Sequence, residues 1–304
     1  MMKKNPEDHL KPTQALWTFV ALAWLVLGVG AAAAEEAPYV ELVEEYKTPG
    51  IETELSGIHP HITDDDLYYV VTNGRPPQNP SMEPMLPVEL RNKLLTVNRE
   101  GEVVRVIDLP DGGGLFGDLA FGDGHLWLGP LDPPELWKLD LKSGKVVAEY
   151  PLPGPAGGLF FDQERSAIIV SNYVGHPHLA VVDSKTGVVV DSIWGDENCQ
   201  GMAKVDGDWV TVWSSSWEAD AYTELWNLDQ ETGKPKTRLR MDGIHAGMAP
   251  LDKKVAGYEG FITLVHVGSG VSGETVIRKF RYVGEAHRET AAQTQIASQT
   301  SSED

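Results

Sequence analysis

Oxygen-bearing side chains recur where short apolar segments of the chain turn, and they are the first candidates for chemistry. Carboxylate and amide oxygens are the ligands that a hard cation such as Ca²⁺ prefers. Brought to one opening of a fold, these side chains would form a site for a divalent cation. The alternative is that Asp and Asn simply stabilise turns. The residues in question are Glu54, Asn73, Asp118 and Asn172.

A second set of side chains in neighbouring positions suits a ligand-binding surface. It combines imidazole and amide groups with two indoles that flank the serines at 214–216. A few polar groups beside aromatic rings are typical of small-molecule pockets, while burial of the indoles in the core is the alternative. The set consists of His59, Asn198, Gln200, His245, Trp213 and Trp217.

Two His-Pro-His sequences, at 59–61 and 176–178, and a single cysteine suggest further chemistry. Side chains two apart on a strand share a face, which would suit Zn²⁺ or Cu²⁺, but the central proline favours a loop or bulge. Cys199 follows acidic residues, which raise the pKa of a thiol and weaken it as a nucleophile. No catalytic set emerges, so catalytic residues and enzymatic activity stay open.

The elements that must position these residues are repeated β-hairpins. In each, an alternating strand leads to Asp or Asn, a short polar turn with Gly, and a second alternating strand. Gly supplies the positive φ that such turns need, and Asp or Asn stabilises their first residue. The four copies span 94–107, 136–150, 179–193 and 225–239.

A second hairpin precedes each copy, so that the repeating unit has four strands. It begins with a small residue, near Gly57, Asp118, Gly158, Gly201 and Gly247. Units of this size are typical of the blades of a β-propeller. The small residue fits an inner strand at the central channel, where the blades converge.

The sequence therefore predicts an all-β fold, a β-propeller of about five four-stranded blades, with a sixth blade as the alternative. The segment 39–50 resembles a fourth strand that would complete the last blade and remove an exposed edge. Alternatively, 261–283 supplies the third and fourth strands of that blade, and 39–50 is a remnant of another. The insert at 75–91, rich in Pro and Met, is interpreted as a lid or docking loop.

Three regions are expected along the chain. Lysines, a long apolar run and four alanines before Glu35 predict a secretory signal peptide over 1–34, cleaved after Ala34. An uncleaved membrane anchor is the alternative, because the run is nearly long enough to span a bilayer. The propeller domain is placed at 35–284. The polar tail at 285–304 has little apolar surface to bury and is predicted to be disordered.

The charge balance narrows the partners. With 25 Lys and Arg against 45 Asp and Glu, the net charge is −20. Phosphate backbones and anionic lipids repel such a chain, so nucleic acid is excluded as a partner and no membrane association is expected after signal cleavage. One cysteine excludes an internal disulfide, which leaves core packing to hold the fold.

The repeats DGHLWLG, LWKLDLKSGKVV and LAVVDSKTGVVV resemble the broad propeller superfamily with lactonase-type, NHL-type and quinoprotein-like repeats. The segment 54–74 is similar to the opening blade of phytase-like or SdiA-regulated exported propellers. The segment 117–153 is similar to five-bladed plant-type glutaminyl cyclases, although the FTQG and FGEG stretches of that family are absent. These resemblances imply a propeller, and they carry no catalytic residue onto this chain.

The function expected from the sequence is that of an exported, periplasmic or secreted binding module. It would hold a small molecule or a protein at one mouth of its channel. The alternative is an enzyme at the same mouth, either a lactonase-like hydrolase dependent on a divalent cation or a glutaminyl-cyclase-like aminoacyl transferase. No cofactor is certain, and Ca²⁺ is the candidate.

Overall fold

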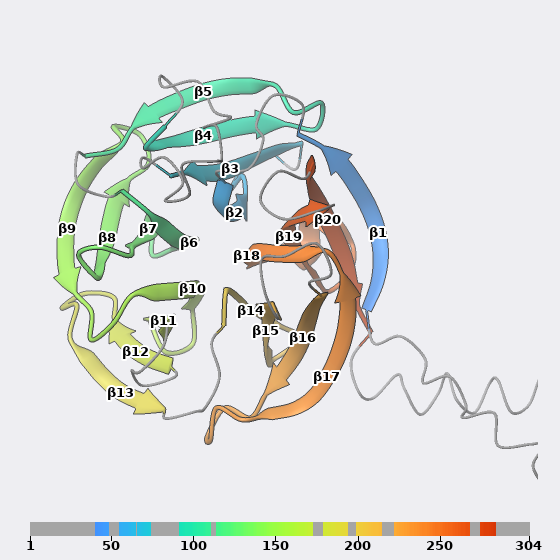
Figure 1. The fold of residues 1–304 in the computed structure, drawn as a ribbon. Coiled ribbons are helices and arrows are strands. Elements are labelled where there is room, and N and C mark those ends of the chain that lie inside the picture. The colour runs from blue at the N-terminus through green and yellow to red at the C-terminus, as the bar shows by residue number, and fades with distance from the viewer. Residues whose placement is uncertain are drawn as a thin grey trace, which may run out of the picture. The chain divides into compact units, whose positions relative to one another are not determined.

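A computed structural model describes residues 40–48, 55–64, 66–73, 91–110, 114–172, 179–193, 199–214, 222–267 and 274–283. These residues form five four-stranded antiparallel sheets that surround one axis as the blades of a propeller (Figure 1). The predicted all-β fold with five blades is therefore confirmed. The predicted signal peptide, the insert at 75–91 and the polar tail lie outside the described residues, apart from Arg91.

Blades one to four each run from the axis outward in chain order. Blade one contains β2 (Leu55–Pro60), β3 (Leu67–Thr72), β4 (Lys93–Asn98) and β5 (Val103–Asp108). Blade two contains β6 (Phe116–Gly122), β7 (His125–Pro130), β8 (Glu135–Asp140) and β9 (Lys145–Pro151). Blade three contains β10 (Ala156–Asp162), β11 (Ala167–Asn172), β12 (Leu179–Asp183) and β13 (Val189–Ile193). Blade four contains β14 (Gly201–Val205), β15 (Asp208–Ser214), β16 (Tyr222–Leu228) and β17 (Pro235–Asp242).

Blade five joins the two ends of the described chain. It contains β18 (Ile244–Pro250), β19 (Gly260–Val267), β20 (Glu274–Tyr282) and, outermost, β1 (Val40–Lys47). β1 lies antiparallel beside β20, with Val40 opposite Tyr282 and Lys47 opposite Val276 (Figure 1). The first interpretation of 39–50 is thus confirmed. The alternative with a remnant blade is wrong, because 261–283 supplies the second and third strands instead.

The hydrophobic core is divided into five clusters, one at each junction between neighbouring blades. Blades one and five, for example, bury Ile58, Tyr68 and Val70 against Ile262 and Leu264. The other four junctions contain equivalent clusters. Since every blade packs against two others, the ring closes with five blades and leaves no place for a sixth.

The outer hairpin turns owe their similarity to one hydrogen-bonding pattern. In blade two the carboxylate of Asp140 accepts from the backbone N–H of Ser143 at 2.6 Å and from its hydroxyl at 2.7 Å. Asp183 with Thr186, and Asp229 with Thr232, repeat the pattern in blades three and four. These hydrogen bonds lower the pKa of all three carboxyls. The sequence signature of the repeat is therefore a turn that an Asp side chain stabilises by accepting hydrogen bonds from the residues within it.

At the axis, four blades present glycine and blade two presents Asp118. A Cβ atom added to Gly247 would lie 2.7 Å from the Cα atom of Gly57, and one added to Gly158 would lie 2.8 Å from the Cα atom of Gly201. The inner strands thus touch backbone to backbone. This explains the small residues found in the sequence, because no side chain fits at four of the five positions.

The carboxyl of Asp118 occupies this axis and is fully buried. It accepts backbone N–H groups of Leu119 at 2.9 Å, Leu159 at 3.3 Å and Met248 at 3.4 Å, which belong to blades two, three and five. The backbone of Met202, in blade four, also donates to it. Burial raises the pKa of Asp118 well above its usual value, while these donors oppose the rise. One side chain therefore ties four blades together at the centre.

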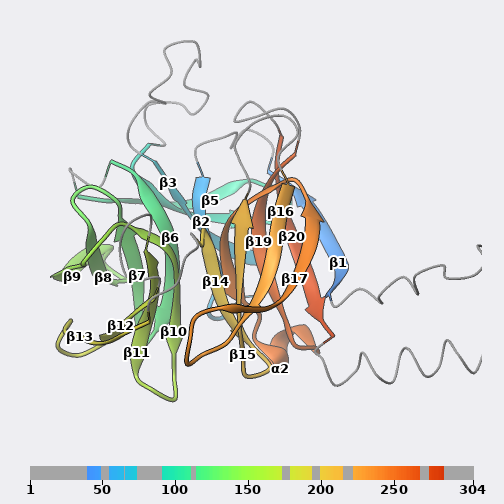
Figure 2. The same ribbon diagram turned by 60° about the horizontal axis from the view of Figure 1, so that its bottom comes forward.

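A single helical turn, α2 (Lys253–Ala256), interrupts the β18–β19 connection. Asp252 caps its start by accepting from the backbone N–H of Lys254 at 2.8 Å, and Gly257 ends it with a φ of 78°. α2 lies at the end of the molecule where the β14–β15 hairpin also turns (Figure 2). No helix in the described part of the chain is long and apolar enough to cross a bilayer.

Candidate functional site

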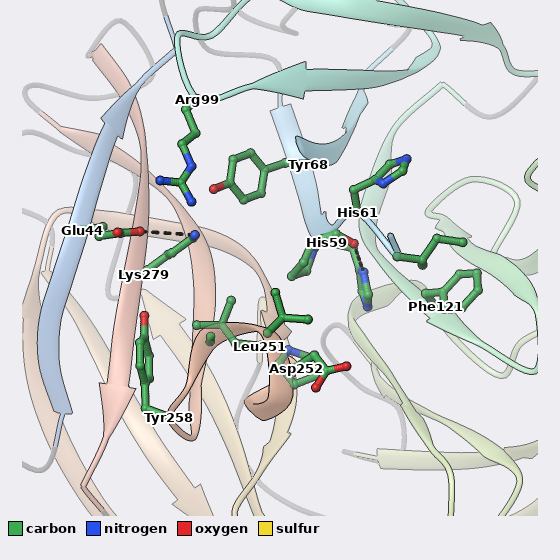
Figure 3. A pocket seen from close by; sticks show the side chains of 15 residues that line it. Glu44, His59, His61, Tyr68, Arg99, Phe121, Leu251, Asp252, Tyr258 and Lys279 are labelled. Carbon is green, nitrogen blue, oxygen red and sulfur yellow. Dashed lines mark hydrogen bonds and ion pairs between the residues drawn. The ribbon is translucent and has the colours of Figure 1, made fainter. Parts of the chain in front are cut away.

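A pocket of about 500 Å³ opens between blades one and five, beside α2 (Figure 3). Its walls come from the end of β2, the β4–β5 turn, the β18–β19 connection and the middle of β20. The side chains at its centre are His59, Leu251 and Asp252. This position is off the axis and at the end of the propeller away from the loops that lead into the inner strands. It differs from the channel mouth that the sequence suggested.

One end of the pocket is a cluster of charges and tyrosines. Lys279, only 7% exposed, pairs with Glu44 at 3.2 Å between ammonium and carboxylate. The Arg99 guanidinium pairs with Asp66, and it lies 5.5 Å from the ring centre of Tyr46. The Lys279 ammonium lies at the same 5.5 Å from that ring. Two cations therefore flank one tyrosine, a favourable cation–π arrangement in a partly desolvated site.

The charges of this cluster stabilise one another. The hydroxyl of Tyr46 donates to Glu44, which together with Lys279 lowers the pKa of that carboxyl against the effect of burial. Burial would lower the pKa of Lys279, but its hydrogen bond to Tyr68 and the charge of Glu44 raise it. Burial and the bond to Glu44 raise the pKa of Tyr46. At neutral pH the carboxylate and the ammonium are therefore charged and the phenol is neutral.

The remainder of the pocket is mainly apolar. Leu251 and Pro250 form one wall and Phe121, from the end of β6, forms the opposite side. Ile62 and Val255 lie at the rim and are 46% and 58% exposed. Exposed aliphatic side chains at the rim, and apolar walls behind them, suit a ligand with an apolar body.

His59 projects from β2 into the middle of the pocket (Figure 3). Its Nδ1 atom lies 2.7 Å from the carbonyl oxygen of Pro60. Its ring centre is 6.2 Å from that of Phe121. Burial lowers the pKa of His59 to about 4, although the bond to Pro60 acts in the opposite direction. The imidazole is therefore neutral at physiological pH.

The structure places the predicted cation ligands in different settings. Asn73 follows β3 and accepts from the backbone N–H of Phe116 at 2.9 Å, which braces blade one against blade two. Asn172 ends β11 and is buried. Asp118 lies at the axis, where converging N–H dipoles oppose a cation. Glu54 lies outside the described residues. Among the residues that the structure describes, no group of three His, Cys, Asp or Glu side chains could hold a metal ion.

The residues predicted to bind a ligand also separate. His245 is fully buried at the start of β18, and burial lowers its pKa to about 3. Gln200 precedes β14, and its backbone N–H donates to Val212 at 2.9 Å. The ring of Trp213 stacks on Trp226 with centres 5.6 Å apart, which places it against the core. Among the members of this set that the structure describes, only His59 lines the pocket. Asn198 and Trp217 lie outside the described residues.

The remaining candidates are Cys199 and the two His-Pro-His sequences. Cys199 is buried, and its carbonyl oxygen accepts from the Ser171 hydroxyl at 3.0 Å. His61 follows β2 and lines the pocket beside His59, with its ring 4.8 Å from that of Tyr69. The second His-Pro-His sequence, 176–178, is outside the described residues. Sequence reasoning missed Glu44, Arg99 and Lys279. A signal existed in the longer connections after β2 and β18, because blades one and five are neighbours once the ring closes.

Comparisons with known proteins support the architecture. No protein-family model and no curated protein matches the sequence. Glutaminyl cyclase of Myxococcus xanthus is similar in structure, with a TM-score of 0.54 and 12% identity over 81% of this chain and 97% of that chain. The tail fiber of Staphylococcus aureus phage P68 has a TM-score of 0.53 and 15% identity over 90% of this chain and 58% of that chain. A streptogramin B lyase has a TM-score of 0.42 and 13% identity over 78% and 68%. At these identities the first two likenesses establish the fold alone, and the lyase, with its lower TM-score, adds nothing to that conclusion.

Proposed function

We propose that this propeller is a binding protein for a small amphipathic organic acid, held in the pocket between blades one and five. The observation that carries the proposal is the charged end of the pocket. Arg99 and Lys279 line this end, and their carboxylate partners are Asp66 and Glu44, respectively. A guanidinium or ammonium group carries more N–H donors than one carboxylate uses, and the remaining donors are suited to a ligand carboxylate, with which Arg and Lys form the stronger, charge-assisted hydrogen bonds.

The local charge matters because the whole chain has the opposite sign. With a net charge of −20, the molecule as a whole repels anions. A partly buried pair of cations is therefore a specific local feature. Contacts with Tyr46, Tyr68 and Glu44 fix the positions of the two cations before any ligand binds. Such preorganisation reduces the cost of ordering side chains on binding.

The pocket retains the binding role expected from the sequence but gives it another location. Several residues that the sequence analysis assigned to the channel mouth, Glu54, Asn198 and Trp217, lie outside the described residues. The lactonase-like hydrolase with its divalent cation and the cyclase-like transferase stay predictions. Export through the segment 1–34 is part of the proposal, and it would place the binding protein in the periplasm or outside the cell.

The proposal is tested with octanoate and octanol, two probes with the same apolar body and different head groups. Calorimetric titration of the protein is expected to show saturable binding of octanoate and much weaker binding of octanol. The Lys279→Gln variant should bind octanoate between roughly tenfold and a hundredfold more weakly, because a charge-assisted hydrogen bond contributes roughly 1.5–3 kcal/mol.

Arg278→Gln is the matched control. Arg278 is the neighbour of Lys279 on β20, and it pairs with a glutamate of β1, Glu45, at 2.6 Å, but it does not line the pocket. Its replacement should leave octanoate affinity unchanged. Equal affinities for octanoate and octanol, or equal losses in the two variants, would show that the charged end does not select an acid.

A further inference from the structure

We infer that the ligand also carries a hydrogen-bond donor, a hydroxyl or an amino group, at the end away from its acid group, and that His59 accepts from it. This inference rests on the proposed function and adds the chemical class of the ligand. It assigns the two ends of the pocket opposite requirements. The end with Lys279 donates to the ligand, and the region of His59 and Asp252 accepts from it.

The tautomer of His59 follows from a single hydrogen bond. The carbonyl oxygen of Pro60, 2.7 Å from Nδ1, can only accept, so Nδ1 carries the proton. A neutral imidazole has one N–H, and Nε2 is therefore left with a lone pair. Within the described residues Nε2 has no hydrogen-bond partner. An acceptor fixed in this way discriminates in favour of a ligand that brings a donor.

The surroundings of His59 add a second acceptor and restrict its movement. Its ring projects toward Leu251 and Asp252, with Phe121 on the other side (Figure 3). The Oδ1 atom of Asp252 accepts a hydrogen bond from the backbone N–H of Lys254 in the first turn of α2. The carboxylate is thereby fixed at the pocket wall. Phe121 packs beside the imidazole, so the orientation of Nε2 is set before the ligand binds.

The two ends are separated by apolar surface from Leu251 and Pro250. A matching ligand has an acid group, an aliphatic or aromatic body, and a hydroxyl or amino group at the far end. The class is therefore that of hydroxy or amino acids whose two polar groups are at opposite ends. A plain fatty acid would satisfy the charged end and leave Nε2 of His59 buried without a partner, which lowers its affinity.

The test compares octanoate with its omega-hydroxy and omega-amino derivatives. Calorimetry on the full-length protein is expected to give about three- to tenfold tighter binding of at least one derivative, the range that one added hydrogen bond produces. His59→Phe keeps an aromatic side chain and removes both nitrogens. In this variant the advantage of the derivative should disappear, and octanoate affinity should rise, because octanoate no longer buries an unpaired nitrogen. The derivative that gains identifies the donor as hydroxyl or ammonium.

Nitrogen NMR of histidine-labelled protein provides a readout that does not depend on the variant folding. The Nε2 resonance of His59 is expected at the position of an unprotonated nitrogen. It should shift when the omega-substituted ligand binds and stay in place when octanoate binds. Asp252→Asn serves as the comparison, since it changes the neighbouring acceptor and preserves His59.

The outcomes separate this inference from the proposed function. If octanoate binds through Lys279 but neither derivative gains, the inference is overturned and the proposed function stands. A gain that persists in His59→Phe, or that disappears only in Asp252→Asn, removes His59 from its assigned role. If none of the three probes binds, the proposed function itself fails.

Discussion

Replacing Asp118 is the most severe test of how the ring is held together. Alanine at this position removes the acceptor of four backbone N–H groups, those of Leu119, Leu159, Met248 and Met202. A buried N–H without an acceptor costs about 1–3 kcal/mol, so the loss lies between roughly 4 and 12 kcal/mol. We expect roughly 4 kcal/mol, at the lower limit, because the alanine variant has no carboxyl to desolvate. Asp118→Asn retains one acceptor oxygen and should lose about half as much.

The assay is urea unfolding followed by tryptophan fluorescence, with the free energy of unfolding taken from linear extrapolation. Asp191→Asn is the control, because Asp191 is exposed and its Oδ1 atom accepts only the N–H of Ser192, at 2.8 Å. It should change the free energy by less than about 1 kcal/mol. If Asp118→Ala is as stable as the control variant, the axial carboxyl does not tie the blades together.

The pH dependence of the same variants supplies an independent check. Burial raises the pKa of Asp118 in the folded state. A raised pKa means that this group contributes stability at low pH that is lost as the pH rises through the folded-state value. The difference in stability between the wild type and Asp118→Asn should therefore be largest in acid and decrease toward alkaline pH. A difference that grows with pH would refute this reasoning.

Three further predictions concern other parts of the chain. Burial lowers the pKa values of His59, His245 and His266 to about 4, 3 and 4, respectively. These neutral imidazoles contribute stability above about pH 6.5, and the protein should lose it as the pH falls toward the lowered pKa values. Urea unfolding midpoints at several pH values would show the loss. Deleting residues 1–48 removes β1 and exposes the edge of β20, so the product should aggregate or unfold in gel filtration and circular dichroism, and a monomer as stable as the parent would contradict ring closure by β1. Mass spectrometry of the exported protein should find an N-terminus at Glu35, whereas a retained apolar segment would favour the membrane anchor.

The fold was largely predictable because the residues that define each repeat lie close together in the sequence. Asp140, Asp183 and Asp229 hold equivalent turns, and each turn fixes the pairing of the two strands around it. The alternation of apolar residues then assigns each strand two faces, which are buried between blades in the inner strands, whereas the outermost strands β5, β9 and β13 stay largely exposed. What local signals did not decide was the closure of the ring. It depends on pairing β1 with β20, whose residues lie at opposite ends of the sequence.

The pocket was only partly predictable, for the same physical reason. His59 was identified from its chemistry, but its position at the far end of β2 required the register of the strand. Glu44, Arg99 and Lys279 each look like ordinary charges on strands or turns. Their meeting depends on ring closure, which places the strand that contains Glu44 beside the one that contains Lys279. Charge clusters made by distant segments leave no spacing pattern in a sequence.

The axis requires close backbone packing and the pocket requires open space, and different kinds of residue provide the two. At the axis, Gly57 and Gly247 bring backbones into contact and Asp118 fills the remaining space, so the channel is closed at this level. A ligand therefore needs a cavity away from the axis. Such a cavity requires departures from the repeat, and these gather in blades one and five, where the connections after β2 and β18 are lengthened and α2 is inserted. Regular positions hold the propeller together, and the irregular ones, which meet only after the ring has closed, form the pocket that we propose as its binding site.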